Sequence, residues 1–134
     1  MNCGIIRPVY NKSTRTGSRC RSTLTNCRRL VNVANDKAME GLRTGSYPDG
    51  ATLAEEMLEW ISTANGGARE GQRRVVGVMV KDSQRYASTG GWAYGSFDEG
   101  SRADKLDAKS REACHQCHIA RKDQGYVFTE YLER

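Results

Sequence analysis

Residues 114–118 read Cys114-His115-Gln116-Cys117-His118, a Cys-x-x-Cys-His pentapeptide in the last quarter of a 134-residue chain. Two thiols about one helical turn apart can add to the two vinyl groups of a haem, and the histidine that follows them can bind the iron. The spacing therefore predicts a covalently attached haem c, with Cys114 and Cys117 as the attachment points and His118 as the metal ligand.

A Cys-x-x-Cys pair also occurs in zinc sites and in redox dithiols. A zinc site needs a second pair of ligands, and the other thiols, Cys3, Cys20 and Cys27, form no such pair. A thioredoxin-like dithiol follows a strand at the start of a helix, whereas residues 107–122 read as a polar helix with the cysteines well inside it. Haem attachment is favoured, and a zinc-binding module, which predicts a colourless protein, stays as an alternative of a different class.

Local signals predict both helices and strands upstream of the motif. Residues 35–43 predict a short helix with Asn35 or Asp36 as its N-cap and Gly45 in the C-terminal glycine position. Residues 73–80 are rich in β-branched side chains and predict a strand. Residues 91–97 are expected to pair with it.

Residues 51–61 are ambiguous on pattern alone, because their apolar side chains recur at helical spacing. These are Leu53, Met57, Trp60 and Ile61.

Three ordered blocks of this sequence resemble the cytochrome P-460 family. The first is the motif with its aromatic continuation, A-C-H-Q-C-H-I-A-R-K-D-Q-G-Y-V-F-T-E-Y at 113–131. The second is G-V-M-V-K-D-S-Q-R-Y-A at 77–87, followed by T-G-G-W-A-Y at 89–94 and Phe97. The third and weaker block spans residues 31–56, with R-T-G at 43–45 and P-D-G at 48–50. Together they cover residues 31–134, which we interpret as the haem domain.

The resemblance implies an α+β fold, an antiparallel β-sheet with a few helices, one of which carries the haem attachment motif. It also implies a strand at 51–61, and we follow it there because tertiary context often overrides local propensity. Members of the family oxidise hydroxylamine to nitrogen oxides at the haem iron, so the resemblance implies a haem-dependent hydroxylamine oxidoreductase.

The family's distinguishing lysine, which is bonded to the haem edge, is absent here. In the family pattern it stands five positions after the Asp-Gly turn and just before a glutamate, a place that Glu55 and Glu56 occupy in this chain. A beta-type cytochrome c-prime, a close relative that lacks the cross-link and binds NO or CO without catalysis, is therefore the alternative, with an electron-transfer cytochrome as a further one. An oxidase needs a proton acceptor near its substrate, and Glu55 and Glu56 are the candidate catalytic residues, with Asp98 and Glu99 as further acidic groups.

The second axial position of the iron decides between ligand binding and simple electron transfer. His115, between the two thioether positions, is expected to point outward, which leaves Met39, Met57, Met79 or a lysine as internal ligands. We expect an open site that takes a small nitrogenous or gaseous ligand. Trp92 and Tyr94 are expected to share a sheet face; they are interpreted either as ordinary sheet packing or as cofactor-binding aromatics that border the haem.

Charge is distributed unevenly along the chain. Seven of its 21 basic residues and none of its 16 acidic residues lie in residues 1–30, so the remaining 104 residues carry a small net negative charge. The basic character therefore belongs to residues 1–30, which we interpret as a disordered or non-native leader. No recognised binding module accompanies it, so we expect no nucleic-acid partner.

No apolar run reaches the roughly 18 residues that a membrane span needs, and residues 1–30 hold no secretory apolar segment. Covalent haem attachment in bacteria takes place outside the cytoplasmic membrane, so we expect a periplasmic protein whose start is truncated or misassigned. A redox partner cytochrome follows from an oxidase function. The family often dimerises, which implies a homodimer.

Overall fold

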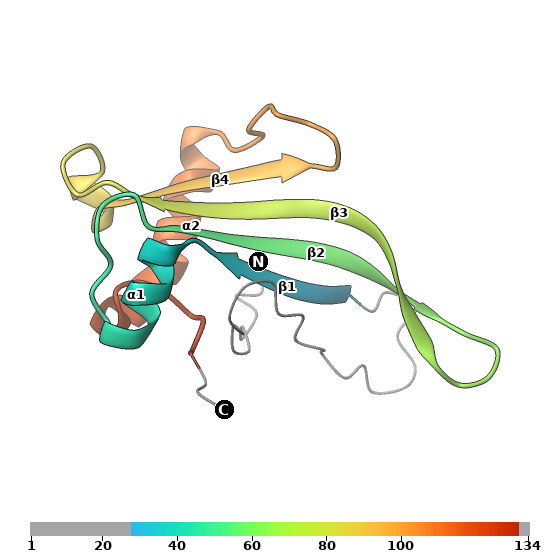
Figure 1. Cartoon of the computed structure of the whole chain (residues 1–134). Coiled ribbons are helices and arrows are strands. Elements are labelled where there is room, and N and C mark those ends of the chain that lie inside the picture. Colours follow the sequence, from blue (N-terminus) through green and yellow to red (C-terminus); the bar gives the residue numbers. More distant parts are fainter. Residues whose placement is uncertain (1–27, 132–134) are drawn as a thin grey trace.

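The computed structural model describes residues 28–131 of the chain. Within this range four strands form one sheet in the order β1-β2-β3-β4, and every neighbouring pair is antiparallel (Figure 1). The strands are β1 (Arg28–Ala34), β2 (Thr52–Ser62), β3 (Ala68–Lys81) and β4 (Trp92–Asp98). The helices are α1 (Asp36–Thr44), α2 (Ala108–His118) and the short 3₁₀ helices η1 (Ala87–Thr89) and η2 (Ile119–Gln124). The predicted α+β fold with an antiparallel sheet is confirmed.

Helix α1 has the two ends that the sequence predicts. The side chain of Asn35 accepts a hydrogen bond from the backbone N–H of Ala38 at 2.9 Å, which satisfies one of the free donors of the first turn. The same Asn35 oxygen accepts a second bond from the N–H of Thr52 at 3.0 Å, so the cap also ties the helix to β2. Gly45 ends the helix with a φ of 78°, a conformation that glycine adopts at no steric cost.

Strand β2 confirms the choice of a strand for residues 51–61. It lies between β1 and β3, so its backbone is hydrogen-bonded along both edges. Paired neighbours on two sides outweigh the helical spacing of its apolar residues, because those pairings satisfy the backbone N–H and C=O groups of the strand. The tip of the β2–β3 hairpin extends away from the rest of the sheet (Figure 1).

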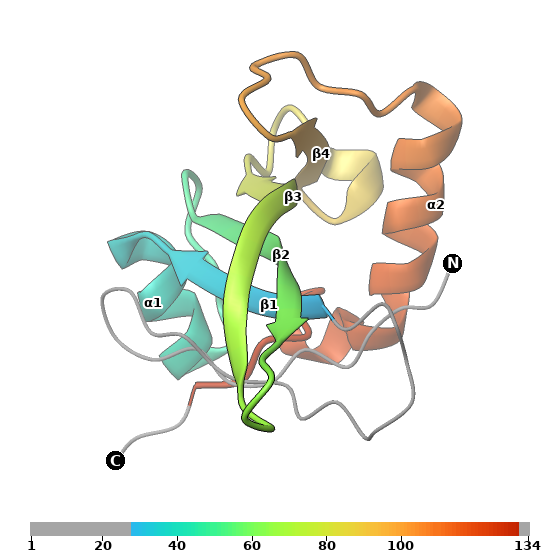
Figure 2. The same ribbon diagram turned by 90° about the vertical axis from the view of Figure 1, so that its right-hand side faces the viewer.

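The strand register decides which side chains share a face of the sheet. Residues directly opposite each other on neighbouring strands point to the same side. Glu55 lies opposite Asn32 on β1 and Gly77 on β3, and the next row along contains Leu53, Met79 and Tyr94. This face of the sheet looks toward the helix that carries the Cys-x-x-Cys-His motif, which stands alongside the sheet in Figure 2.

Helix α2 is shorter than the sequence predicts. It begins after Asp107, whose carboxylate accepts a 2.7 Å hydrogen bond from the N–H of Ser110, and its α-helical part ends at His118 instead of continuing to residue 122. The chain then tightens into η2 and turns at Gly125 and Tyr126, where φ is 66° and 67°. This turn brings the chain after the motif back against the helix.

Trp92 is the centre of the hydrophobic core and is fully buried. Its indole Nε1 donates a 2.9 Å hydrogen bond to the carbonyl of Gly125, and its ring packs edge-on against Tyr47 with 5.3 Å between the ring centroids. The core thus connects β4, the turn after α1 and the segment after α2. Within residues 28–131, the longest helices are too short and too polar to cross a membrane.

Candidate haem site

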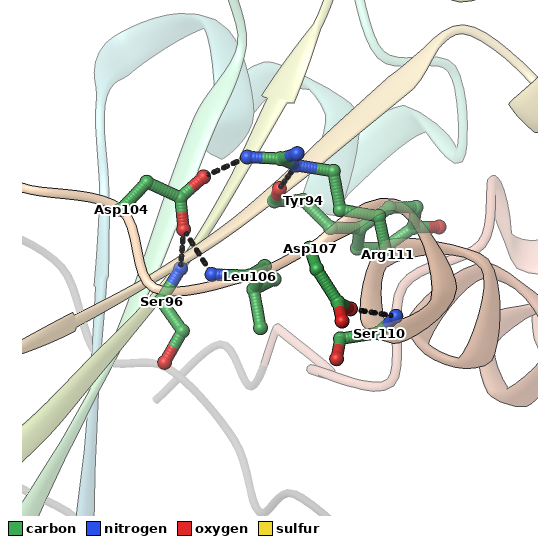
Figure 3. A network of polar contacts seen from close by, with 7 residues as sticks. All are labelled: Tyr94, Ser96, Asp104, Leu106, Asp107, Ser110 and Arg111. Atoms are coloured by element: carbon green, nitrogen blue, oxygen red, sulfur yellow. Dashed lines mark hydrogen bonds and ion pairs between the residues drawn. The ribbon is translucent and has the colours of Figure 1, made fainter.

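A network of polar contacts fixes the start of α2 to β4 (Figure 3). The carboxylate of Asp104 accepts hydrogen bonds from the backbone N–H groups of Ser96 and Leu106, both at 3.0 Å, and forms an ion pair with Arg111 on α2. Arg111 also donates to the carbonyl of Tyr94 at 3.3 Å. These bonds hold the pKa of Asp104 to about 2, the backbone N–H groups of Ser96 and Leu106 having the largest effect. The network positions the motif helix relative to the sheet.

We expect the Asp104→Asn substitution to destabilise the protein in a pH-dependent way. Because the pKa of Asp104 is lower in the folded state than its ordinary 3.8, the carboxylate stabilises the fold above that value, and this contribution is lost as the pH falls toward 2. Urea midpoints of the variant should lie below those of the parent near neutral pH and converge with them in acid.

The matched control is Asp98→Asn, which removes an exposed carboxylate that pairs with Lys105 near the same loop. Exposed pairs contribute little, so its urea midpoint should follow that of the parent at every pH. Two results would contradict the stabilising role assigned to the Asp104 carboxylate. One is an equal decrease of the urea midpoint in both variants, and the other is a decrease in Asp104→Asn that persists in acid.

A cavity of about 550 Å³ lies between the sheet and α2. Its volume is within the roughly 300–1,000 Å³ of small-molecule sites. The lining is largely apolar, as a flat macrocycle requires, and it comes from all four strands, from α2 and from the C-terminal segment. The lining residues are Asn32, Leu53, Ala54, Glu55, Gly77, Val78, Met79, Tyr94, Gly95, Ala113, Cys114, Cys117, His118, Val127, Phe128 and Thr129.

His118 lines this cavity and has the arrangement of an iron ligand. Its Nδ1 lies 2.7 Å from the carbonyl oxygen of Tyr126, which can only accept, so Nδ1 carries the proton and Nε2 keeps a lone pair. Such a bond to the second ring nitrogen is the usual way in which a ligating histidine is oriented. Burial lowers the pKa of His118 and so favours the neutral ring that binds metals. Phe128, edge-on at 5.0 Å, and Tyr94, at 5.1 Å, confine the imidazole.

Both cysteines of the motif also line the cavity. The Cys114 thiol is half-buried, and its pKa is raised mainly by burial and also by the charge of Asp104. Cys117 takes part in a disulfide in this structure, so thioether formation at Cys117 requires that bond to be reduced first. Cys3, Cys20 and Cys27, the remaining thiols of the zinc alternative, lie outside the described residues.

The structure separates the two candidate catalytic glutamates. Glu55 lines the cavity, and its Oε2 atom is buried without a hydrogen-bond partner; burial raises the pKa of this carboxyl group. Glu56 does not line it, because the next residue of a strand points to the opposite face, where Glu56 forms an ion pair with Arg73 at 3.1 Å. Asp98 and Glu99 are exposed at the end of β4 and are not part of the lining.

The two candidate aromatics are also separated. Tyr94 lines the cavity, packs against His118 and buries a hydroxyl group that has no hydrogen-bond partner. Trp92 shares its sheet face, as predicted, but is not among the lining residues and belongs to the core beneath Tyr47. For Trp92 the packing interpretation therefore fits the structure better than contact with the haem.

His115 is absent from the cavity lining, as expected for a side chain that points away from the haem, but it is buried and not exposed to solvent. Its ring is 7% exposed, stacks on Tyr126 at 5.8 Å and approaches Tyr94 at 6.3 Å, and its Nδ1 is buried without a partner. The turn at Gly125 folds Tyr126 over this side of the helix. Among the methionines considered as internal ligands, Met79 lines the cavity, whereas Met39 and Met57 are absent from its lining.

Several lining residues were not singled out from the sequence as site residues, and neither was Tyr126. Asn32 and Gly77 are the cross-strand neighbours of Glu55, and a Cβ built on Gly77 would have no heavy atom within 4 Å, so this part of the wall is open. Tyr126 contributes through its backbone carbonyl. Only the register of β2 could have revealed Asn32 and Gly77, and no sequence pattern reports a backbone acceptor.

The residues present fit a haem, since an apolar cavity contains an oriented histidine with a free Nε2 and two cysteines one helical turn apart. The fold and the site together define a small α+β haem-protein domain. The model of the cytochrome P460 family matches residues 9–129 of the chain. The chain therefore belongs to the cytochrome P460 family. The residues matched by the family model begin at residue 9, upstream of Val31, where the similarity of individual sequence blocks starts. The domain boundary at residue 31 stays a prediction. No curated protein matches the chain.

Proposed function

We propose that the protein is a c-type mono-haem protein in which Cys114 and Cys117 hold the haem and His118 binds the iron. The observation that carries this proposal is the cavity that has both cysteines and the oriented His118 in its wall. The hydrogen bond from Nδ1 to the Tyr126 carbonyl supports an iron-binding role for Nε2. With Nδ1 already hydrogen-bonded, Nε2 is the ring nitrogen whose lone pair is left for a metal.

The reaction that we propose is the oxidation of hydroxylamine to a nitrogen oxide. When bound, the haem supplies an iron that binds the substrate nitrogen and passes electrons to a redox partner cytochrome. The part left to the protein is proton transfer. We assign proton transfer to Glu55, because this residue lines the same cavity and has a buried carboxyl oxygen without a hydrogen-bond partner. Burial also raises the pKa of its carboxyl group, which suits a group that accepts protons.

Non-catalytic binding of NO or CO is the second candidate. It is favoured by the mainly apolar lining and by the glutamate at the place of the family's cross-linking lysine. A neutral diatomic ligand needs no proton acceptor, so this function gives Glu55 no essential task. The two candidates therefore differ in what they predict for Glu55.

In the haem-loaded protein, Glu55→Gln should slow hydroxylamine oxidation with an artificial electron acceptor by roughly 10²–10⁴-fold, the usual contribution of a general base. Glu56→Gln is the matched control, because Glu56 points away from the cavity, and its rate should equal that of the parent. CO binding to the reduced iron should be similar in all three proteins.

If the parent does not oxidise hydroxylamine but binds NO and CO reversibly, gas binding becomes the assigned function. The absorption spectrum of the dithionite-reduced protein gives a further check. A strongly red-shifted Soret band would mean a modified, cross-linked haem, and an ordinary high-spin haem c spectrum would mean an open, unmodified iron.

The partners and the compartment follow from the chemistry. We propose a periplasmic location, because covalent haem attachment in bacteria occurs there, and a redox cytochrome as the electron acceptor. A homodimer is proposed from the family alone. Sedimentation of the haem-loaded protein tests it.

A further inference from the structure

In the part of the chain that the structure describes, Glu55 is one of two cavity-lining residues, the other being Tyr94, that bury a side-chain oxygen without a hydrogen-bond partner. One of its carboxyl oxygens is buried and has no hydrogen-bond partner. Neither lysine nor arginine is among the described residues that line the cavity. An isolated carboxylate is costly to bury in an apolar site unless it acquires a proton, a cation or a hydrogen-bond donor. A cation or a hydrogen-bond donor brought by the molecule that occupies the cavity would supply the partner that this oxygen lacks.

The position of Glu55 relative to His118 suggests which partner that is. His118 enters the cavity from α2, whereas Glu55 enters it from β2 in the middle of the sheet on the opposite wall. The side of Glu55 toward β3 is open, because its cross-strand neighbour is Gly77, where even a Cβ would touch nothing. The residue opposite Glu55 on β3 therefore contributes no side chain that would block movement of its carboxylate.

We propose that Glu55, from the sheet side of the cavity, would serve as an internal oxygen ligand of the oxidised iron of a bound haem and would give way to substrate and to reduction. This inference rests on the proposed haem attachment and adds a means of regulating the same site. Carboxylate oxygen is a hard ligand that suits hard cations, and the ferric iron of a porphyrin carries a net positive charge that the ferrous form lacks. One-electron reduction, here by dithionite, weakens the iron–oxygen bond, which breaks with both bonding electrons staying on the carboxylate.

Met79 is the competing internal ligand, because it also lines the cavity and lies one row from Glu55 on β3. Its thioether is a soft, neutral ligand, so it would bind the reduced iron at least as well as the oxidised iron. It also leaves the orphaned carboxyl oxygen of Glu55 unexplained. The two ligands therefore predict opposite dependences on the redox state.

The test compares the haem-loaded parent with Glu55→Gln, Glu55→Asp and Met79→Leu, after their haem content has been measured. The ferric absorption and electron paramagnetic resonance spectra of the parent and of Met79→Leu should show a six-coordinate iron with an oxygen ligand. Both Glu55 variants should lose this signature, because an amide oxygen binds weakly and the aspartate side chain is one methylene shorter. The Glu56→Gln variant should match the parent.

Azide binding gives a second readout that does not depend on turnover. If Glu55 occupies the ferric iron for nine-tenths of the time, the apparent azide affinity of Glu55→Gln should be about tenfold higher than that of the parent. CO affinity for the ferrous iron should be unchanged. Identical ferric spectra and azide affinities in parent and Glu55 variants, or a change confined to Met79→Leu, would overturn the inference while leaving haem attachment intact. A parent that carries no haem would overturn both.

Discussion

The Cys114→Ala/Cys117→Ala double variant is expected to retain no haem after denaturation. The parent should keep its haem through denaturing electrophoresis, because two thioether bonds survive the loss of the fold. Without the thiols, the haem is held by the cavity walls and by His118 alone, and those contacts disappear on unfolding. Haem staining of a denaturing gel measures this result directly.

Each single cysteine variant is the control for the double variant. Cys114→Ala keeps the thiol at Cys117, and Cys117→Ala keeps the thiol at Cys114, so either should retain a reduced amount of haem through one bond. Haem staining of the double variant at the level of the parent would show that attachment occurs elsewhere and would invalidate the site.

The second large effect is expected at Trp92, whose replacement by alanine should lower the free energy of unfolding by about 3–5 kcal/mol. This side chain is fully buried and packs against Tyr47, so its removal leaves a cavity in the core. It also releases the carbonyl of Gly125, next to the Tyr126 carbonyl that orients His118. Urea unfolding of the haem-loaded protein measures the loss.

Trp92→Phe separates packing from hydrogen bonding. It keeps an aromatic ring in the core but leaves the Gly125 carbonyl without its donor, so its loss should be smaller, about 1–3 kcal/mol. A loss below about 1 kcal/mol for Trp92→Ala would be typical of a surface position and would show that Trp92 is not the centre of the core.

The elements that sequence could predict are those whose signals are local. The Asn35 cap and Gly45 define α1 because capping acts over a few residues. Strand β2 was harder, since its apolar spacing is helical and its pairing with β1 and β3 is not visible in the sequence itself. The family resemblance supplied that missing context.

The candidate site shows the same division between local and tertiary information. The Cys-x-x-Cys-His spacing predicts the chemistry of the cavity wall, yet the burial of His115 depends on Tyr126, which a later turn folds over it. The distinction between Glu55 and Glu56 was available in principle. Adjacent residues of a strand point to opposite faces, so a strand at this position allows only one of them to face the cavity.

The central claim is that the motif helix carries the haem covalently in this cavity. Mass spectrometry of a tryptic digest tests it most directly, using protein produced with a signal peptide, the cytochrome c maturation machinery and reduced thiols. Cleavage after Arg111 and Arg121 releases the peptide 112–121, which contains both motif cysteines and His118. The proposed site predicts this peptide with the added mass of one haem bonded to Cys114 and Cys117. If a digest of fully matured protein contained this peptide only in its haem-free form, the claim would be contradicted.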